Sequence, residues 1–400
     1  MRSKKLEEIL LTQPIVSSHS HHLPDEEQRG MTLAKMLANA YTAQKWLGLP
    51  TPTKAIEVDD WLSKICNRSF YVWLERALQY LYDIQEPLSS RTWLVYDERI
   101  REAYQDPQWH LSLLQGTCKY ERIANDSPWN PGSDLGHPEL FSPVFRINSF
   151  LCGYDKDARD SNGNNAQLLY KTQIDDMDDY IHLLRKKVEE KKKTGCTALK
   201  SAIAYFRPIH VAPASKKQAQ AALNFAGTNG TDEDIRNFQD YVFEQICKLS
   251  AEFDIPMQIH TGLGKMNQTN AMQIQGLVSR NPETTFILMH GGYPWIDDYA
   301  GLLFSYRNVI ADTCWLPHIS PSAAYRTLHE LMEVCDLDRV VWGCDTWTSE
   351  ESFGTRMAFL QVLSTVLNEK IASGYFSEDL ACSFAKAILY ENANRIFKQH

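Results

Sequence analysis

Short apolar runs that end in a polar residue recur along the chain and predict buried strands. The clearest are residues 255–260, 285–290 and 339–345, which end in His260, His290 and Asp345 with glycine nearby. Apolar runs of this length close to glycine are typical of buried parallel strands. Because helical periodicity fills the intervals between them, as in residues 233–253 and 271–279, the pattern indicates βα units.

Five further runs bring the expected strands to eight. They are residues 15–19, 119–124, 143–150, 198–205 and 309–311. Helical periodicity in residues 174–193, 352–367 and 380–398 predicts helices that cover the outside. Eight parallel strands that alternate with helices close into a barrel, so the expected fold class is α/β, a (β/α)8 TIM barrel.

A long helical segment interrupts this alternation after the first strand. Residues 25–115 lack strand patterns and carry helical periodicity in four stretches, at residues 31–43, 59–66, 70–83 and 93–104. We therefore expect a catalytic barrel made of residues 1–24 and 116–400, with residues 25–115 as a large helical insertion that caps the active-site face. Residues 206–231 contain several prolines and glycines and predict a loop over the site.

Composition and charge exclude two kinds of partner. The formal net charge of −9 argues against nucleic acid and against an anionic membrane surface. No apolar stretch approaches the roughly 18–20 residues that span a bilayer, and residues 1–11 lack the apolar core of a signal peptide. Nine cysteines without a Cys-x-x-Cys pair fit a reducing compartment. We expect a cytoplasmic protein that binds a small-molecule substrate, and a homo-oligomer stays possible.

Two histidines one residue apart, His19 and His21, end the first expected strand. Side chains alternate between the two faces of a strand, so both imidazole rings point the same way and can converge on one ion. Imidazole is the commonest metal-binding side chain. In a (β/α)8 barrel the carboxyl ends of the strands form the active face, which would bring His260, His290 and Asp345 close to this pair.

The order of these residues resembles that of the amidohydrolase superfamily. Its (β/α)8 barrels carry a His-x-His pair on strand one, histidines at the ends of strands five and six, and an aspartate at the end of strand eight. The chain shows His19, His21, His260, His290 and Asp345 in that order. Residues 198–205, 257–264 and 288–294 are similar to the amidohydrolase domain of FluG-like proteins, and the insertion is similar to that of uronate isomerases.

The resemblance implies a divalent metal site with one or two ions. Its ligands would be His19, His21, His260 and Asp345, and N/O ligation with an open position favours Zn2+ over Mn2+ or Fe2+. Some superfamily members carry a lysine at the end of strand four that is carboxylated and bridges two metals. Lys200 lies in the expected fourth strand, where an unpaired buried ammonium is costly. Carboxylation, a salt bridge to a substrate acid and a neutral catalytic amine stay open for it.

The reaction that the resemblance favours is hydrolysis of a C–N bond by metal-activated water. Asp345 would take the water proton and pass it to the leaving group. His290 would stabilise the developing oxyanion, and Lys200 is the third catalytic candidate. The superfamily also contains isomerases and decarboxylases, so a uronate-isomerase-like aldose–ketose isomerase and a metal-dependent decarboxylase are the alternatives.

Cationic and aromatic residues near the strand ends predict a substrate that carries a carboxylate. Arg146 lies in the third expected strand and Arg207 follows the fourth, and a guanidinium can hold a carboxylate with two hydrogen bonds. Unpaired cations are unusual in an otherwise acidic protein unless an anion binds to them, and the alternative is that Asp and Glu neighbours pair with these arginines. Tyr205 and Trp315 would line the pocket. We therefore expect Arg146, Tyr205, Arg207 and Trp315 to bind substrate.

Overall fold

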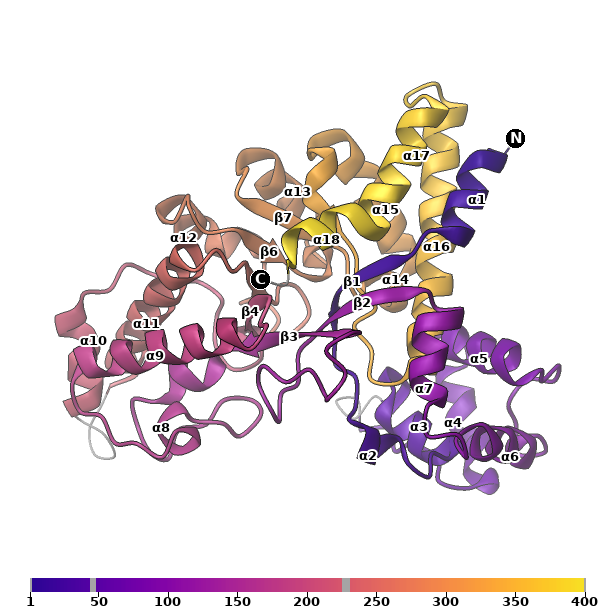
Figure 1. The fold of residues 1–400 in the computed structure, drawn as a ribbon, viewed down its shortest axis with the longest axis horizontal. Coiled ribbons are helices and arrows are strands. Elements are labelled where there is room, and N and C mark those ends of the chain that lie inside the picture. The colour runs from indigo at the N-terminus through magenta and orange to yellow at the C-terminus, as the bar shows by residue number, and fades with distance from the viewer. Residues whose placement is uncertain (1, 44–47, 225–230, 399–400) are drawn as a thin grey trace.

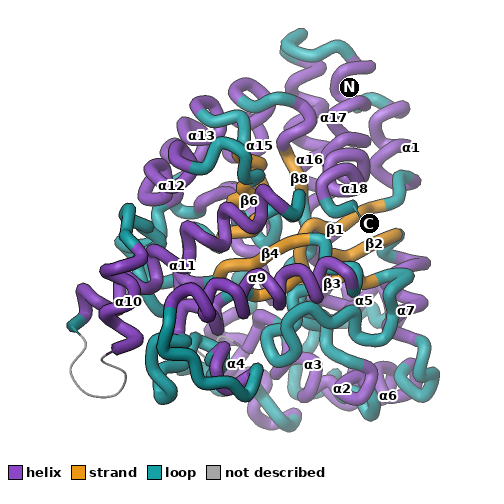
Figure 2. The backbone as a smooth tube through the Cα atoms, turned by 60° about the vertical axis from the view of Figure 1, so that its left-hand side comes forward, coloured by secondary structure: helices purple, strands orange, loops and turns teal. Residues whose placement is uncertain are grey.

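Eight parallel strands form the centre of the protein, as a computed structural model covering residues 2–43, 48–224 and 231–398 describes it. The strands pair in chain order from β1 to β8 (Figures 1 and 2). They are β1 (Ile15–Ser20), β2 (Tyr120–Asn125), β3 (Phe141–Arg146), β4 (Ala198–Ser201), β5 (Met257–Ile259), β6 (Phe286–Leu288), β7 (Val309–Asp312) and β8 (Val340–Val341). The expected (β/α)8 barrel is confirmed.

Backbone hydrogen bonds join the last strand to the first and close the barrel. The amide of Ser18 donates to the carbonyl oxygen of Trp342 at 3.1 Å, and the amide of Asp345 donates to the carbonyl oxygen of His19 at 2.9 Å. Pairing with β1 therefore continues for several residues after β8. This pairing fixes Asp345 beside the histidines of β1.

Apolar side chains fill the amino-terminal half of the barrel interior. Seven strands each contribute one buried residue, namely Val16, Ala124, Val144, Ala198, Ile287, Ile310 and Val341. Helix α18 (Asn392–Ile396) packs against them through Ala393, and Phe397 follows in the same cluster. The amino end of the barrel is thus closed by an apolar plug, and polar groups are left to the carboxyl end.

Helices on the outside connect the strands and pack against the barrel (Figure 2). They are α1 (Lys4–Thr12), α8 (Ala166–Leu169), α9 (Met177–Lys193), α10 (Lys216–Asn224), α11 (Asp232–Glu252), α12 (Gln275–Arg280), α13 (Ile296–Ser305), α14 (Leu316–Ile319), α15 (Pro321–Val334), α16 (Ser349–Ala372) and α17 (Glu378–Lys386). The longest connecting helix before β5, α11, begins with a capping box between Thr231 and Asp234. Over the described ranges, none of the helices is both long and apolar enough to cross a membrane.

The helices between β1 and β2 form a separate group, which we call the cap. They are α2 (Asp25–Gln28), α3 (Leu33–Asn39), α4 (Ala55–Ile65), α5 (Ser69–Tyr82), α6 (Trp93–Ala103) and α7 (Trp109–Ser112). They have an apolar core of their own, which includes Leu33, Trp61, Leu74 and Ile100. In Figure 1 they lie together at the lower right, where α5 packs along α16. Whether residues 25–115 fold as a separate unit stays a prediction.

Three expectations about secondary structure are wrong in detail. The fourth strand ends at Ser201, and Ile203–Tyr205 form a 3-10 turn. The third strand likewise ends at Arg146, before the 3-10 turn Asn148–Cys152. The side chain of Asn148 accepts the amide hydrogen of Ala202 at 2.9 Å, so a side chain takes the place of a ladder partner.

The expected loop at residues 206–231 contains a helix. Helix α10 forms because its sequence is rich in alanine, lysine and glutamine, which are strong helix formers. The flanking prolines and glycines hid this signal. Residues 225–230 of the same link lie outside the described residues.

Candidate metal centre

His19 and His21 turn their Nε2 atoms toward each other at the carboxyl end of β1. The two atoms are 3.3 Å apart and both side chains are buried. Nδ1 of His21 lies 2.7 Å from the carbonyl oxygen of Asp126. A carbonyl oxygen only accepts, so Nδ1 carries the hydrogen and Nε2 keeps its lone pair directed at the site. Burial lowers the pKa of His21 to about 4, so this ring is neutral near pH 7.

Asp345 faces this pair from the segment that follows β8. Its Oδ1 lies 3.6 Å from Nε2 of His21 and 3.9 Å from Nε2 of His19. The hydroxyl of Tyr41, from the cap, donates a hydrogen bond to the same oxygen at 3.1 Å. Burial raises the pKa of Asp345 to about 7, against the opposing charge of Lys200. The carboxyl group is therefore poised to gain or lose a proton near neutral pH.

The spacing of these donors fits a divalent metal ion. Two nitrogens bound tetrahedrally to one zinc at about 2.0–2.1 Å lie about 3.3 Å apart. The Nε2 atoms of His19 and His21 have this separation, at 3.3 Å. Two neutral imidazoles and one carboxylate are also donors that borderline metals prefer. His19, His21 and Asp345 thus form a donor set that a divalent cation would complete.

His260 and His290 form a second pair of rings, which has fewer N–H hydrogens than its close nitrogen and oxygen contacts would need. Nδ1 of His260 lies 3.0 Å from Nε2 of His290, and the outer nitrogens face the carbonyl oxygens of Leu263 and Cys314. Three hydrogen bonds need three ring hydrogens, whereas two neutral imidazoles carry two. Burial lowers the pKa of both rings, to about 3 for His260. With hydrogens on the two outer nitrogens, both inner nitrogens keep lone pairs that a cation could use.

The donor atoms gather in two groups within the described part of the chain. One group is His19, His21 and Asp126, and the other is His290, Cys314 and Asp345. Within each group the donor atoms lie within 4.8 Å of one another. Asp345 connects the groups, because its Oδ2 lies 3.5 Å from Nδ1 of His290. The structure thus brings together His19, His21 and Asp345, three of the four expected ligands. The fourth, His260, contacts His290 instead.

Sequence reasoning missed two members of these groups. Asp126 follows β2 directly, in the same position as the polar residues that end the other strands, so the strand-end rule could have found it. Cys314 follows β7 by two residues and touches Nδ1 of His290 at 3.4 Å. Its sequence context offered a weaker signal, because Cys314 lies beyond the strand end at Asp312 and no glycine follows it closely.

Lys200 lies inside the barrel, directly below the histidine pair. Its Nζ is 3.3 Å from Nε2 of His19 and 2.6 Å from the sulfur of Met289, and the residue is 1% exposed. In the described ranges no carboxylate lies within ion-pair distance of it. Burial lowers the pKa of Lys200, while Asp126 and Asp345 act against that shift. As expected, Lys200 is buried in surroundings that disfavour its charged form.

Arg146 and Arg207 have carboxylate partners, which is the alternative that the sequence left open for them. Arg146 forms a buried ion pair with Asp126 at 2.5 Å. Arg207 pairs with Asp240 on α11 at 2.6 Å and also donates to the carbonyl oxygen of His210 at 2.7 Å. Arg146 reaches the candidate metal centre indirectly, because its partner Asp126 also contacts His21. Arg207 ties the segment after β4 to α11, which is a structural role.

Aromatic rings surround the histidines. The ring of Tyr205 lies 4.6 Å from that of His260 and is 46% exposed, and the ring of Trp315 lies 5.2 Å from that of His290. The indole nitrogen of Trp315 is buried without a hydrogen-bond partner. Both residues were expected to line the pocket, and both contact the site.

Two more aromatic rings lie at the site. Trp347 stacks on His21 at 4.8 Å, and Tyr41 reaches Asp345 from the cap. Trp347 follows Asp345 by two positions in the chain, which is enough to place it near the pocket. Tyr41 gave no signal, because a contact across three hundred and four positions leaves no local pattern.

Fold and site together define a (β/α)8 barrel of the metal-dependent enzyme class, with its donors at the carboxyl ends of the strands. The model of the Amidohydrolase family matches residues 204–399. The resemblance to the amidohydrolase superfamily is therefore confirmed for the carboxyl-terminal half of the chain.

Relatives agree with this assignment. Protein fluG of Emericella nidulans is 30% identical over 149 residues, which are 36% of this chain and only 17% of the length of fluG. A uronate isomerase from Thermotoga maritima superposes with a TM-score of 0.79 at 18% identity, over 99% of this chain and 96% of its own. A glucuronate isomerase from Caulobacter crescentus gives 0.76 at 15% identity, over 98% and 92%. At these identities the two isomerases share the fold.

Proposed function

We propose that the protein is a metal-dependent hydrolase that cleaves a C–N bond, of the amide type, in a small molecule that carries a carboxylate. One observation supports this proposal most strongly. The carboxylate of Asp345 lies 3.6 Å from His21 with one oxygen and 3.5 Å from His290 with the other. A group so placed can exchange a proton both with a nucleophile at the histidine pair and with a group beside His290.

His19, His21 and Asp345 would hold the metal, and zinc is the favoured ion for two imidazoles and a carboxylate. Once bound, the ion would lower the pKa of a water molecule and polarise the substrate carbonyl. Asp345, whose pKa burial raises to about 7, would accept the proton of the attacking water and deliver it to the leaving nitrogen. His290 would orient the substrate carbonyl or stabilise the negative charge that develops on its oxygen.

Lys200 is the residue that best supports an acidic substrate. Arg146 and Arg207 are held by aspartates, whereas the ammonium of Lys200 contacts His19 and Met289. We propose that its ammonium meets the substrate carboxylate, or that it is carboxylated and joins the metal. Tyr205 and Trp315 would form the walls of the pocket, the second with a free indole N–H. Arg146 would act through Asp126 and His21.

An aldose–ketose isomerase acting on a uronate is the second candidate. The specific observation in its favour is the whole-chain superposition on the uronate isomerase, cap included, with a TM-score of 0.79. In that reaction Asp345 would move a proton between adjacent carbons of the sugar. The same metal donors would hold the sugar oxygens. Decarboxylation on the same barrel has no observation of its own.

The test is a substrate comparison on one protein preparation. The protein is stripped of metal, reloaded with zinc, manganese or nothing, and offered γ-glutamyl amides, dipeptides and uronates. We expect amine release that depends on metal, with zinc the most effective. Turnover of uronates alone would overturn the hydrolase in favour of the isomerase. Metal-independent turnover, or a chain that binds no metal, would overturn both.

Lys200 can be tested in the same assay. Lys200→Met should abolish amine release, because the side chain lies next to His19. Dependence of the wild-type activity on added bicarbonate would select carboxylation. Loss of selectivity for the free acid over its amidated analogue in Lys200→Gln would select contact with the substrate.

A further inference from the structure

Two consecutive glutamates are buried where the cap meets the barrel. Glu350 and Glu351 lie in the first turn of α16, and they are 0% and 1% exposed. Over the part of the chain that the structure describes, neither forms an ion pair. Buried carboxylates without a counter-charge are costly unless hydrogen bonds stabilise them. The hydrogen-bond donors that contact Glu350 and Glu351 therefore indicate the roles of these two glutamates.

Glu350 is held by side chains of the cap. The hydroxyl of Tyr82 donates to its Oε1 at 2.7 Å, the indole of Trp109 donates to the same oxygen at 3.2 Å, and the hydroxyl of Tyr104 donates to Oε2 at 3.1 Å. All three donors come from the cap or its edge, far from the histidines in the chain. Glu350 thus fastens the cap to the first turn of α16.

Glu351 is held by backbone instead, and by two separate segments. The amide of Tyr41 donates to its Oε1 at 2.6 Å, and the amide of Trp347 donates to its Oε2 at 3.0 Å. The side chains of these two residues both end at the candidate metal centre. The hydroxyl of Tyr41 reaches Asp345 at 3.1 Å, and the ring of Trp347 stacks on His21 at 4.8 Å with the planes 21° apart.

We propose that Glu351 is a positioning residue, whose two oxygens set Tyr41 against Asp345 and Trp347 against His21. One carboxylate spans a cap segment and the segment after β8, so it fixes their separation. Each segment then delivers one ring to one donor of the centre. The inference rests on the proposed function only for its activity readout, since the contacts exist independently of any substrate.

The two neighbouring glutamates give a matched pair of variants. A glutamine offers one acceptor and one NH2 group in nearly the same shape. In Glu351→Gln both partners are backbone amides, so the NH2 group must face an N–H and one contact is lost. In Glu350→Gln the hydroxyl of Tyr104 can accept from the NH2 group, while the remaining oxygen keeps Tyr82 and Trp109. The second variant therefore controls for removal of a buried charge beside the first.

The experiment compares the metal-loaded wild type with both variants at pH 8.5 to 9, because burial raises the pKa of Glu351 to about 8. In Glu351→Gln we expect hydrogen exchange at the amide of Tyr41 or Trp347 to quicken by about tenfold or more, the loss expected for one buried hydrogen bond. Release of zinc to a chelator should quicken by at least threefold, by roughly the change that a supporting contact to a ligand makes. In Glu350→Gln all these rates should stay within about twofold.

Activity gives the last readout. On the substrate found by the screen, Glu351→Gln should lower kcat by about tenfold with little change in KM, since the rings it places contact the metal donors. Equal losses in both variants, or a Glu351→Gln protein that does not fold while Glu350→Gln does, would make the pair a plain structural clamp and overturn the proposal. Faster exchange and zinc release without any C–N hydrolysis in the wild type would uphold the positioning role and sink the proposed reaction.

Discussion

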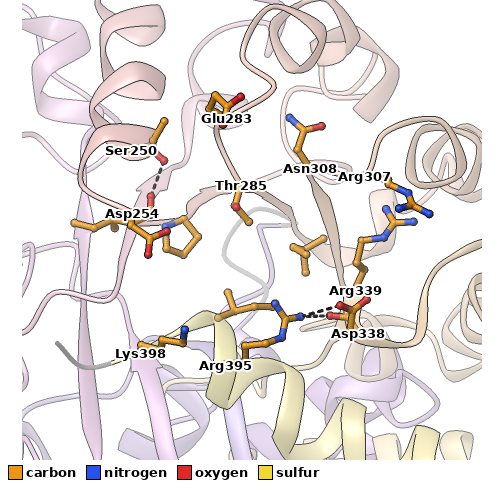
Figure 3. A pocket seen from close by; sticks show the side chains of 15 residues that line it. Ser250, Asp254, Glu283, Thr285, Arg307, Asn308, Asp338, Arg339, Arg395 and Lys398 are labelled. Carbon is orange, nitrogen blue, oxygen red and sulfur yellow. Dashed lines mark hydrogen bonds and ion pairs between the residues drawn. The ribbon is translucent and has the colours of Figure 1, made fainter.

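The two ends of the same barrel bury charge in different ways. At the amino end a cavity of about 350 Å³ is lined by residues such as Arg307, Arg339, Arg395 and Asp338 (Figure 3). Arg339 donates to the carbonyl oxygens of Leu303, Tyr306 and Val309 and to the carboxylate of Asp336. Arg395 reaches Asp338 in the same view. The buried guanidinium of Arg339 thus has hydrogen-bond partners inside the protein, whereas the pair of Arg395 and Asp338 is largely exposed.

At the carboxyl end the buried groups face one another instead. The Nε2 atoms of His19 and His21 meet at 3.3 Å, and Lys200 lies next to His19 rather than next to an acid. Neutral lone pairs pointing at each other are unfavourable unless a cation or proton lies between them. The amino end thus uses charge to hold the fold, whereas the carboxyl end keeps charge and lone pairs available. Substitutions at the two ends should separate stability from activity.

Asp345→Asn should have the largest effect on activity. It removes a ligand and the proton acceptor, so kcat should fall by about 10²–10⁴-fold or more, and zinc per chain should fall well below one. Metal-free stability at pH 8 should be unchanged or higher, because burial raises the pKa of Asp345 to about 7 and so disfavours its charge. The readouts are kcat, elemental analysis and calorimetry. Asp338→Asn at the exposed amino end is the control, and activity retained in Asp345→Asn would refute the assignment.

Arg146→Met and Arg207→Met should both destabilise the protein strongly. Each leaves a buried aspartate without its partner, Asp126 or Asp240, which costs about 3–5 kcal/mol. Only Arg146→Met should also weaken zinc binding, since the Asp126 carboxylate that it holds lies 3.9 Å from Nδ1 of His21. Denaturant unfolding and zinc competition measure the two effects.

The matching control removes both members of the distant pair. Arg207→Met with Asp240→Leu should recover most of the lost stability, because an apolar pair can replace a buried ion pair. If Arg207→Met has normal stability but binds substrate much more weakly, Arg207 is instead a substrate-binding residue.

Most of the fold could be predicted because strands and helices leave local periodic patterns. The run from Ile15 and the alternation that places His19 and His21 on one face needed no tertiary information. The predicted end of the fourth strand lies too far along the chain, because the side chain of Asn148 takes the hydrogen bond of Ala202 that a neighbouring strand would otherwise accept. The helix α10 was missed because flanking glycines outweighed its own composition.

The site could be predicted as far as strand ends define it. Asp345 follows β8 and could be placed, whereas Tyr41 and Glu351 come together only through packing of the cap on α16. The partners of Arg146 and Arg207 lie 20 and 33 positions away, where no pattern in the sequence pairs them. In a sequence, an arginine that binds substrate looks the same as one that pairs with a distant carboxylate.

Arg339→Met should show the opposite of Asp345→Asn. Its guanidinium is buried, and its loss removes a donor from the carbonyl oxygens of Leu303, Tyr306 and Val309, of which that of Tyr306 keeps the amide of Val309. We expect about 2–4 kcal/mol lower stability, from the unmet acceptors and the lost charged hydrogen bonds. At a temperature where the variant is folded, kcat/KM should stay within about twofold of wild type. A hundredfold loss of activity in the folded variant would show that the two ends are coupled.

The pH dependence of zinc affinity should give the smallest effect and the sharpest view of the carboxyl end. Ligands must be deprotonated to bind metal. Burial lowers the pKa of His21 to about 4 and that of His19 below its usual range, so both are neutral above pH 5.5. Asp345, with its pKa raised to about 7, still holds a proton there.

The sign follows from that single proton. Between pH 5.5 and 7 each unit of pH should raise the zinc affinity by about tenfold, or about 1.4 kcal/mol, because one proton must leave. Above pH 7 the affinity should level off. Competition with a chromophoric chelator across this range measures the slope. A slope of two or more would mean that the histidines lose protons as well, and that the carboxyl end does not hold its imidazoles neutral in advance.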